Sequence, residues 1–125
     1  MCAYTNLEQS KKLIELGFSS KTADMHYKVI RSNNESNVSL IPYSSLGYHK
    51  DNDFQYCIPC WSLSALLKLM PILLEGYWRW ILTGHSSGYS CTYLNGDKAF
   101  HSENGSTDIE AAYNMVVWLK ENNYV

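Results

Sequence analysis

The sequence has no excess of charge of either sign. Ten Lys and Arg residues stand against twelve Asp and Glu residues, which gives a formal net charge of -2. Proteins that hold nucleic acid by general electrostatic attraction carry a basic excess. The charge balance therefore argues against a nucleic-acid partner of this kind.

Long hydrophobic runs are also missing. Lys68, Pro71 and Glu75 interrupt the most apolar part of the chain, whereas a membrane-spanning helix needs roughly 18 or more apolar residues. The N-terminus turns polar by Thr5 and lacks the apolar core of a secretory signal. We therefore expect a cytoplasmic protein without membrane contact. The cysteines are then expected to be reduced thiols; they are Cys2, Cys57, Cys60 and Cys91.

Hydrophobic and aromatic residues are plentiful. The chain has 125 residues, of which 46% are hydrophobic and 14% are aromatic. This length fits one domain, and a domain of this size buries only about two thirds of its unfolded surface. Some aromatic rings should therefore stay partly exposed, which favours a binding role.

Three helices are predicted from capping signals and apolar spacing. Thr5 and Glu8 form a capping box that begins a helix over residues 6–16, and Gly17 is placed to end it. Leu63, Leu66, Leu67 and Met70 follow one helix face until Pro71 ends the helix. A second capping box at residues 107–110 begins the longest helix, which runs to residue 122.

The remaining elements are predicted to be strands. Residues 77–83 and 89–94 are predicted to pair across a loop at residues 84–88, and Asn95-Gly96 predicts a hairpin turn into a third strand at residues 98–102. Residues 20–25 are predicted to add a helical turn and residues 26–31 a short strand. Residues 32–56 have no periodicity and are predicted to be an irregular polar loop region, or alternatively an undetected pair of short strands. We expect a single α+β domain over residues 1–125. In it, an antiparallel meander of three or more strands packs against the N-terminal, central and long C-terminal helices.

Two segments carry a family resemblance. Residues 58–71 read IPCWSLSALLKLMP, and residues 108–119 read DIEAAYNMVVWL. They resemble the IPxWSLxALLxLMP and C-terminal DAAxxMxxWL blocks of a family of small proteins from gut bacteria and their phages or prophages. The resemblance implies a cytoplasmic, mobile-element setting and no particular activity.

Two cysteine patterns could carry chemistry. Cys57-Ile58-Pro59-Cys60 precedes a predicted helix, whose N-terminus would lower the pKa of a thioredoxin-like thiol. The polar residues before it are unlike the buried strand of such a site. Zinc could be held by Cys57, Cys60, His85 and Cys91. A zinc-binding or thiol-redox protein is therefore the alternative to a protein without catalysis.

Other catalytic patterns lack their structural context. Gly84-His85-Ser86-Ser87-Gly88 matches G-x-S-x-G, but a nucleophile elbow leads from a strand into a helix, and here strands are predicted on both sides. His26, His49 and His101 have no acid or nucleophile at a recognisable spacing. We therefore predict no catalytic residue and no cofactor, and a protein without enzyme activity is favoured.

Interface candidates come from the aromatic residues. Trp78 and Trp80 share one face of a predicted strand, which is either core or an open platform. On the last helix, Glu110, Asn114 and Glu121 define a solvent stripe that includes Val117, with Trp118 beside it. We interpret the protein as a non-catalytic interaction module of phage or prophage origin that binds an unknown protein or self-associates. Binding of single-stranded nucleic acid by aromatic stacking is a weaker alternative.

Overall fold

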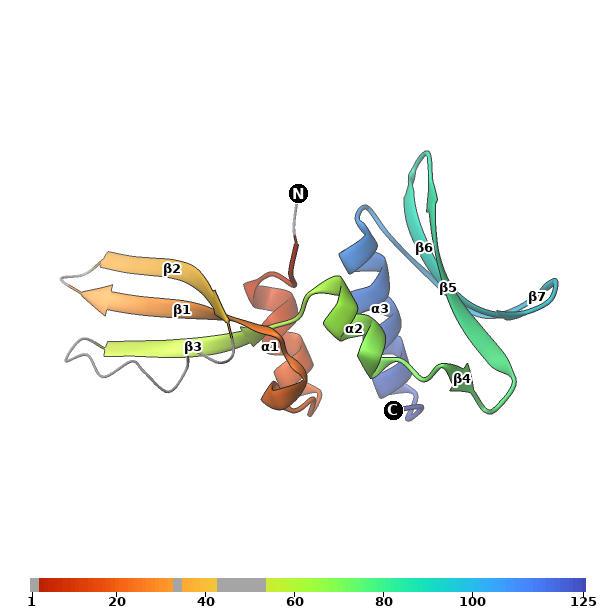
Figure 1. Cartoon of the computed structure of the whole chain (residues 1–125), viewed down its shortest axis with the longest axis horizontal. Coiled ribbons are helices and arrows are strands. Elements are labelled where there is room, and N and C mark those ends of the chain that lie inside the picture. Colours follow the sequence, from red (N-terminus) through yellow and green to blue (C-terminus); the bar gives the residue numbers. More distant parts are fainter. Residues whose placement is uncertain (1–2, 33–34, 43–53) are drawn as a thin grey trace. The chain divides into compact units, whose positions relative to one another are not determined.

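The computed structural model describes residues 3–32, 35–42 and 54–125, and the side chains of residues 3–27 and 58–125. The chain forms two compact units, and we call Tyr4–Ser62 the first unit and Leu63–Val125 the second unit. Both units combine helix with antiparallel strands (Figure 1). The predicted α+β class is confirmed.

The first unit packs a short helix against a three-stranded sheet. After α1 (Leu7–Glu15) and the single turn η1 (Ser20–Thr22), the strands are β1 (Met25–Ser32), β2 (Glu35–Pro42) and β3 (Phe54–Cys60). Their order is β2-β1-β3, and both pairings are antiparallel. The prediction of an irregular region is therefore wrong for residues 35–42 and 54–56, where the alternative of short strands is found. Residues 33–34 and 43–53 lie outside the described residues.

The first helix begins one residue later than predicted. Asn6, not Thr5, is the N-cap: its side chain accepts a hydrogen bond from the backbone N–H of Gln9, and the Gln9 side chain accepts one from the Asn6 N–H. The side chain of Thr5 is fully buried. Its hydroxyl is hydrogen-bonded to Ser10 Oγ at 2.8 Å and accepts from the backbone N–H of Trp61 at 3.0 Å. The Thr5 hydroxyl, which the local pattern predicts to cap the helix, therefore makes a long-range hydrogen bond to Trp61 instead.

Trp61 anchors the first unit at the end of β3. Its side chain is fully buried, and its indole N–H donates to Thr22 Oγ1 at 2.9 Å. Its carbonyl accepts from the N–H of Thr5 at 2.9 Å. The next residue, Ser62, donates its backbone N–H to Asp24 Oδ1. Side-chain bonds from η1 and its flanks therefore hold the chain where it leaves the sheet.

The second unit is a four-stranded sheet with two helices. Its elements are α2 (Leu63–Leu69), β4 (Leu73–Leu74), β5 (Trp78–His85), β6 (Gly88–Asn95), β7 (Lys98–Gly105) and α3 (Asp108–Glu121). The strands lie in sequence order and run antiparallel. α3 packs on β6 and β7 and also contacts α2.

Both hairpin turns of this sheet are tighter or shifted relative to the prediction. His85 pairs with Gly88, so the first turn holds only Ser86 and Ser87 rather than residues 84–88. Asn95 pairs with Lys98, so the second turn is Gly96-Asp97 rather than Asn95-Gly96. Gly96, with φ of 61°, supplies the positive φ that such turns need.

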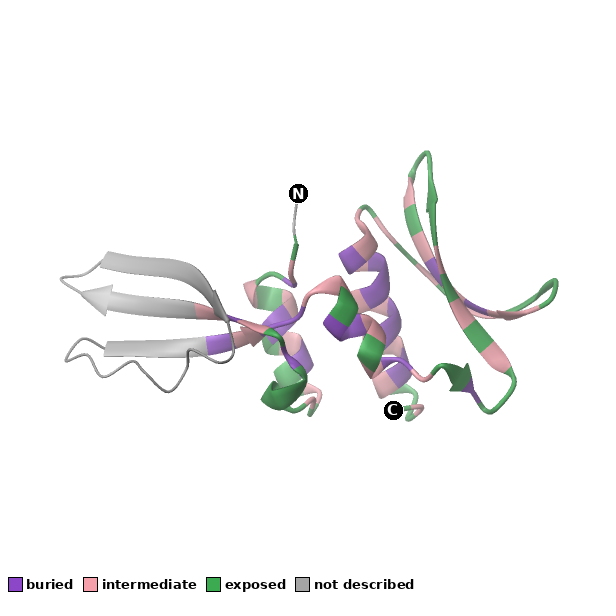
Figure 2. Cartoon of the chain, in the orientation of Figure 1, coloured by how far each residue is buried: buried purple, intermediate pink, exposed green. Residues whose placement is uncertain are grey.

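α3 is the most buried helix of the second unit (Figure 2). Thr107 is its N-cap as predicted, because Thr107 Oγ1 accepts from the N–H of Glu110 at 3.1 Å. The Glu110 carboxylate accepts from Ser106 Oγ instead of reaching back to the cap residue. The buried side chains face the sheet and α2; they are Ile109, Ala111, Ala112, Met115, Val116 and Leu119.

Gly105 lets the first turn of α3 approach the sheet closely. A Cβ at this position would lie 2.4 Å from the Ala111 nitrogen and 2.8 Å from the Glu110 carbonyl carbon. Backbone atoms cannot swing aside as a flexible side chain can. We therefore expect Gly105→Ala to lower the free energy of unfolding by about 1–3 kcal/mol in urea denaturation.

Gly84→Ala is the matched control for this prediction. Its added methyl would meet only the Tyr89 ring, at 3.2 Å, and that ring can shift. Gly84→Ala should therefore cost less than Gly105→Ala. Equal losses for the two variants would contradict a special close approach at Gly105.

Candidate functional site

The two faces of the second sheet have different environments. Residues opposite each other in β5 and β6 lie on the same face of the sheet. Trp80 lies opposite Tyr93, and Leu82 lies opposite Cys91. Tyr93 and Cys91 are fully buried, and Trp80 and Leu82 are half-buried. Ile81, on the other face, is exposed. The face with Trp78 and Trp80 is therefore the one turned to the core, although neither indole is fully covered.

Two of the three aromatic candidates, Trp78 and Trp118, belong to one aromatic cluster and are joined by Phe100. The Trp118 ring stacks on His101, with centroids 3.7 Å apart and planes at 9°, and on Tyr124 at 5.4 Å. Phe100 lies 5.2 Å from Trp78 and 6.0 Å from Trp118. A bulge in the β6–β7 pairing leaves Phe100 without a partner between Ala99 and His101. This irregularity lets consecutive side chains reach the same aromatic cluster.

The Val117–Trp118 patch stays a prediction. Both residues are half-buried on α3, and the Trp118 ring already has neighbours inside the second unit. A ring stacked in this way is held in place, so a partner would meet it as a fixed surface.

His101 has an acidic partner that sequence reasoning missed. Its Nε2 is hydrogen-bonded to the Glu103 carboxylate two residues along β7. Residues i and i+2 share a strand face, so this spacing was a usable signal. In the sheet register Glu103 lies opposite Cys91. An acid–histidine pair thus lies beside a buried thiol.

This thiol is not an active nucleophile. Burial, and then the nearby charge of Glu103, raises the pKa of Cys91 to about 12. A thiol needs a lowered pKa to react as a thiolate near neutral pH. The arrangement keeps Cys91 protonated, and we interpret it as part of the core.

The Cys57–Cys60 motif lies in a strand and not at the start of a helix. Both residues belong to β3. Three residues of extended strand separate their Cα atoms by roughly 10 Å, and a disulfide needs less than about 7 Å. Burial, and then Asp24, raises the pKa of Cys60 to about 12. The side chain of Cys57 lies outside the described residues. The β3 conformation therefore opposes a redox cycle between the two thiols.

The four candidate zinc ligands are divided between the two units. Cys57 and Cys60 belong to the first unit, and His85 and Cys91 to the second. Leu82 lies opposite Cys91, and His85 is three residues further along β5, so His85 and Cys91 project from opposite faces of the sheet. Among the described residues, no three His, Cys, Asp or Glu side chains group as metal ligands.

The G-x-S-x-G segment forms a hydrogen-bonded hairpin end. Ser90 Oγ donates to Asn104 Oδ1 at 2.7 Å and lies 2.9 Å from His85 Nε2. Ser87 Oγ lies 3.0 Å from His85 Nδ1, so both ring nitrogens of His85 are hydrogen-bonded. Strands flank the turn on both sides, so the helix that a nucleophile elbow requires is replaced by a strand.

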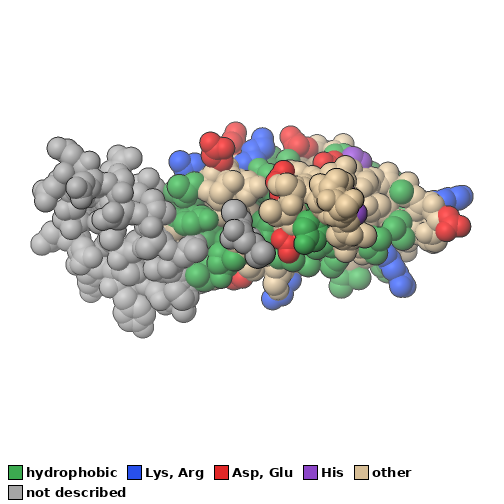
Figure 3. Space-filling model, turned by 90° about the horizontal axis from the view of Figure 1, so that it is seen from above, with side chains coloured by type: hydrophobic (Ala, Val, Ile, Leu, Met, Phe, Trp, Pro, Cys, Tyr) green, Lys and Arg blue, Asp and Glu red, His purple; other side chains and the backbone are tan. Residues whose placement is uncertain are grey.

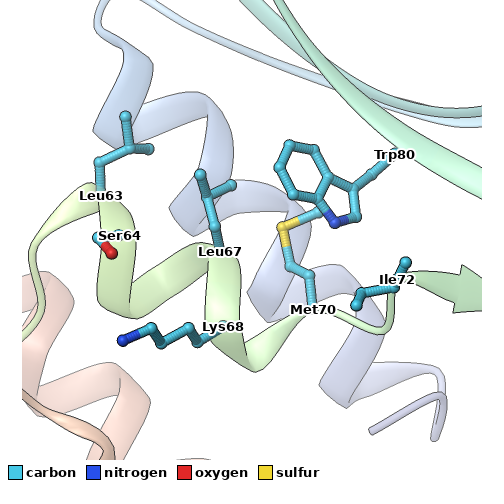
Figure 4. A pocket seen from close by; sticks show the side chains of 7 residues that line it. All are labelled: Leu63, Ser64, Leu67, Lys68, Met70, Ile72 and Trp80. Carbon is cyan, nitrogen blue, oxygen red and sulfur yellow. The ribbon is translucent and has the colours of Figure 1, made fainter.

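An apolar groove lies beside α2. It has a volume of about 540 Å³ and is lined by Leu63, Ser64, Leu67, Lys68, Met70, Ile72 and Trp80. Leu67, Met70, Ile72 and Trp80 converge on it, while the Lys68 ammonium points away from Trp80 (Figure 4). Leu66 and Met70 are buried as predicted, whereas Leu63 and Leu67 are only half-buried because they form the groove wall.

Ile72 was missed because it follows the helix-ending Pro71. It is 80% exposed and stands between this groove and a smaller hollow of about 300 Å³ lined by Ile72, Leu73, Arg79 and Trp80. Isolated exposed apolar residues are common, but contiguous ones mark binding surfaces. Of the four predicted interface residues, Trp80 alone lines these two hollows.

The raised pKa of Cys91 makes a prediction for stability in alkali. The unfolded thiol ionises near pH 9.0 and the folded one near pH 12, so the unfolded state loses protons first. The contribution of the protonated Cys91 thiol to the free energy of unfolding is complete below pH 9. It is lost as the pH rises from 9 toward 12. Urea denaturation at pH 8 and pH 10 should show this loss, and Cys91→Ala should show a shallower one. An unchanged pH dependence in Cys91→Ala would contradict the burial of this thiol.

None of the described helices has the length and hydrophobicity to cross a membrane. In comparisons with known proteins, no family model, no curated protein and no solved structure matches the chain.

Proposed function

We propose that this protein is a cytoplasmic binding module without catalysis, and that its groove beside α2 receives an apolar segment of a partner protein. The observation that carries this proposal is the continuous apolar surface of Leu67, Met70, Trp80 and the 80%-exposed Ile72. A groove of this volume falls in the range of ligand-binding sites. The family resemblance in residues 58–71 supports a phage or prophage origin, and these residues include α2.

The charge distribution supports a protein partner over a nucleic acid. Among the side chains coloured by type in Figure 3, acidic and basic ones are interspersed on the face shown. Single-strand binding would need bases to stack on open rings, whereas the Trp78 and Trp118 rings both pack against Phe100.

The aromatic side of the groove gives the interaction its specificity. Trp80 offers a broad, half-buried ring, and a buried aromatic in a pocket is the usual energetic centre of an interface. Ile72 provides a second apolar anchor, since it lines both the groove and the smaller hollow together with Trp80. A partner segment with one large apolar side chain would fill the space between them.

Ile72→Ser is the sharpest test of this function. Ile72 is so exposed that its loss should leave folding intact, while an anchored partner should bind about tenfold or more weakly. Protein captured from a bacterial lysate on the wild type would be identified, purified and titrated by calorimetry against wild type and variant.

Ile14→Ser is the matched control, because Ile14 is 40% exposed on α1 of the first unit. This variant should keep wild-type affinity. Equal affinity of the partner for wild type and Ile72→Ser would overturn the proposed groove site.

A further inference from the structure

The groove beside α2 and the smaller hollow form one continuous surface. Ile72 and Trp80 line both of them. Leu67 and Met70 extend the surface on the α2 side, and Leu73 extends it onto β4. An occupant that fills both hollows therefore lies against Ile72 and Trp80 with its middle part.

Each of the two hollows has one cation in its lining. Lys68 belongs to the lining of the groove, and Arg79 belongs to the lining of the smaller hollow. Both side chains are exposed. The Lys68 ammonium points away from Trp80 (Figure 4). The shared middle of the surface is thus apolar, and a positive charge lies on either side of it.

The neighbouring side chains do not neutralise these two charges. The cross-strand neighbours of Arg79 are Leu73 on β4 and Leu94 on β6. Lys68 follows Ser64 by four residues on α2, and residues at this spacing are neighbours on a helix surface. Neither cation forms an ion pair with a side chain that the structure describes. Both are therefore available to a bound segment.

The positive charge is local to these hollows. The second unit has six acidic residues against four basic ones, and two of these four, Lys68 and Arg79, line the hollows. In physiological salt an exposed charge acts over about 8–10 Å. A short acidic segment in the hollows therefore meets the two cations, whereas a nucleic-acid strand that continues across the unit meets its acidic excess.

We infer that the partner segment carries one large apolar side chain with an Asp or Glu on each side of it, an inference that rests on the function proposed above. The apolar side chain packs against Ile72 and Trp80. One carboxylate pairs with the Lys68 ammonium and accepts a hydrogen bond from the Ser64 hydroxyl. The other pairs with the Arg79 guanidinium, whose planar fork suits a carboxylate. Apolar burial supplies affinity, and the cations select acidic flanks.

Short synthetic peptides titrated against the full chain test this inference. Each peptide has one central Leu or Phe flanked by two Asp, two Lys or two Ser residues, at several spacings. Nuclear magnetic resonance shifts of the Leu67 and Ile72 amides and of the Trp80 indole N–H report binding in the groove. At low salt, the best Asp-flanked peptide should bind roughly fivefold or more tightly than its Lys-flanked counterpart. This preference should shrink as salt is added.

Reversal of the two charges is the sharper arm of the experiment. Lys68→Glu and Arg79→Glu should each reduce the preference for Asp flanks, and the double variant should prefer Lys flanks. Lys98→Glu is the matched control, because it makes the same charge change at an exposed residue of β7. It should keep the wild-type preference. Circular dichroism would verify that each variant is folded.

The possible failures are distinguishable. Equal binding of Asp-flanked and Lys-flanked peptides in the groove would overturn the acidic partner and leave the apolar groove in place. If no peptide shifts the signals of Leu67, Ile72 and Trp80, the groove itself is contradicted together with this inference. A thymidine oligonucleotide that binds the wild type but not Lys68→Glu would assign the cations to nucleic acid and overturn the inferred partner.

Discussion

The close contact between α3 and the four-stranded sheet determines the rest of the second unit. Gly105 has no side chain to hold the helix away, so α3 packs on β6, in which Tyr93 and Cys91 are fully buried. The buried Tyr93 then donates its hydroxyl hydrogen bond to the Pro71 carbonyl at 2.7 Å. This bond fixes the segment that follows α2, and Ile72 projects from it into the groove. Core packing and the candidate binding surface are thus linked by one buried tyrosine.

Burial also decides which chemistry the side chains can perform. Cys60 and Cys91 are fully buried, and the pKa of each thiol is raised to about 12, mainly by loss of solvation. The same cause raises the pKa of Tyr93. Groups held in their neutral forms stabilise a core and do not serve as nucleophiles near neutral pH. In the second unit, Cys91 and Tyr93 therefore contribute to the packing of the core.

Local signals in the sequence predicted the elements that depend on local interactions. The Thr107 cap, the long last helix and the positive φ at Gly96 follow from neighbouring residues alone. Thr5 was wrongly assigned because its hydroxyl binds Trp61, which is 56 residues away. Local pattern has no access to such a contact. β2 was predicted only as an alternative, because residues 35–42 lack apolar periodicity. Its strand conformation comes from pairing with β1, which local sequence does not show.

The candidate site was harder to predict than the fold, for a related reason. Leu63 and Leu67 share the spacing of the buried Leu66 and Met70, so periodicity assigns all four to the core. Only three-dimensional packing shows that the first two line a groove. His101 and Glu103 were overlooked although their i, i+2 spacing on a strand brings them together.

The brevity of β4 keeps the candidate groove beside α2 open. Pro71 lacks the N–H needed to continue α2, and Tyr93 holds its carbonyl. The chain then reverses within residues 75 and 76, where Glu75 has φ of 54° and Gly76 has φ of 73°. Only Leu73 and Leu74 remain to pair with β5. A longer β4 would cover the edge at residues 80–84 and would lie beside Trp80. The short strand therefore leaves open an apolar groove that a more regular sheet would have closed.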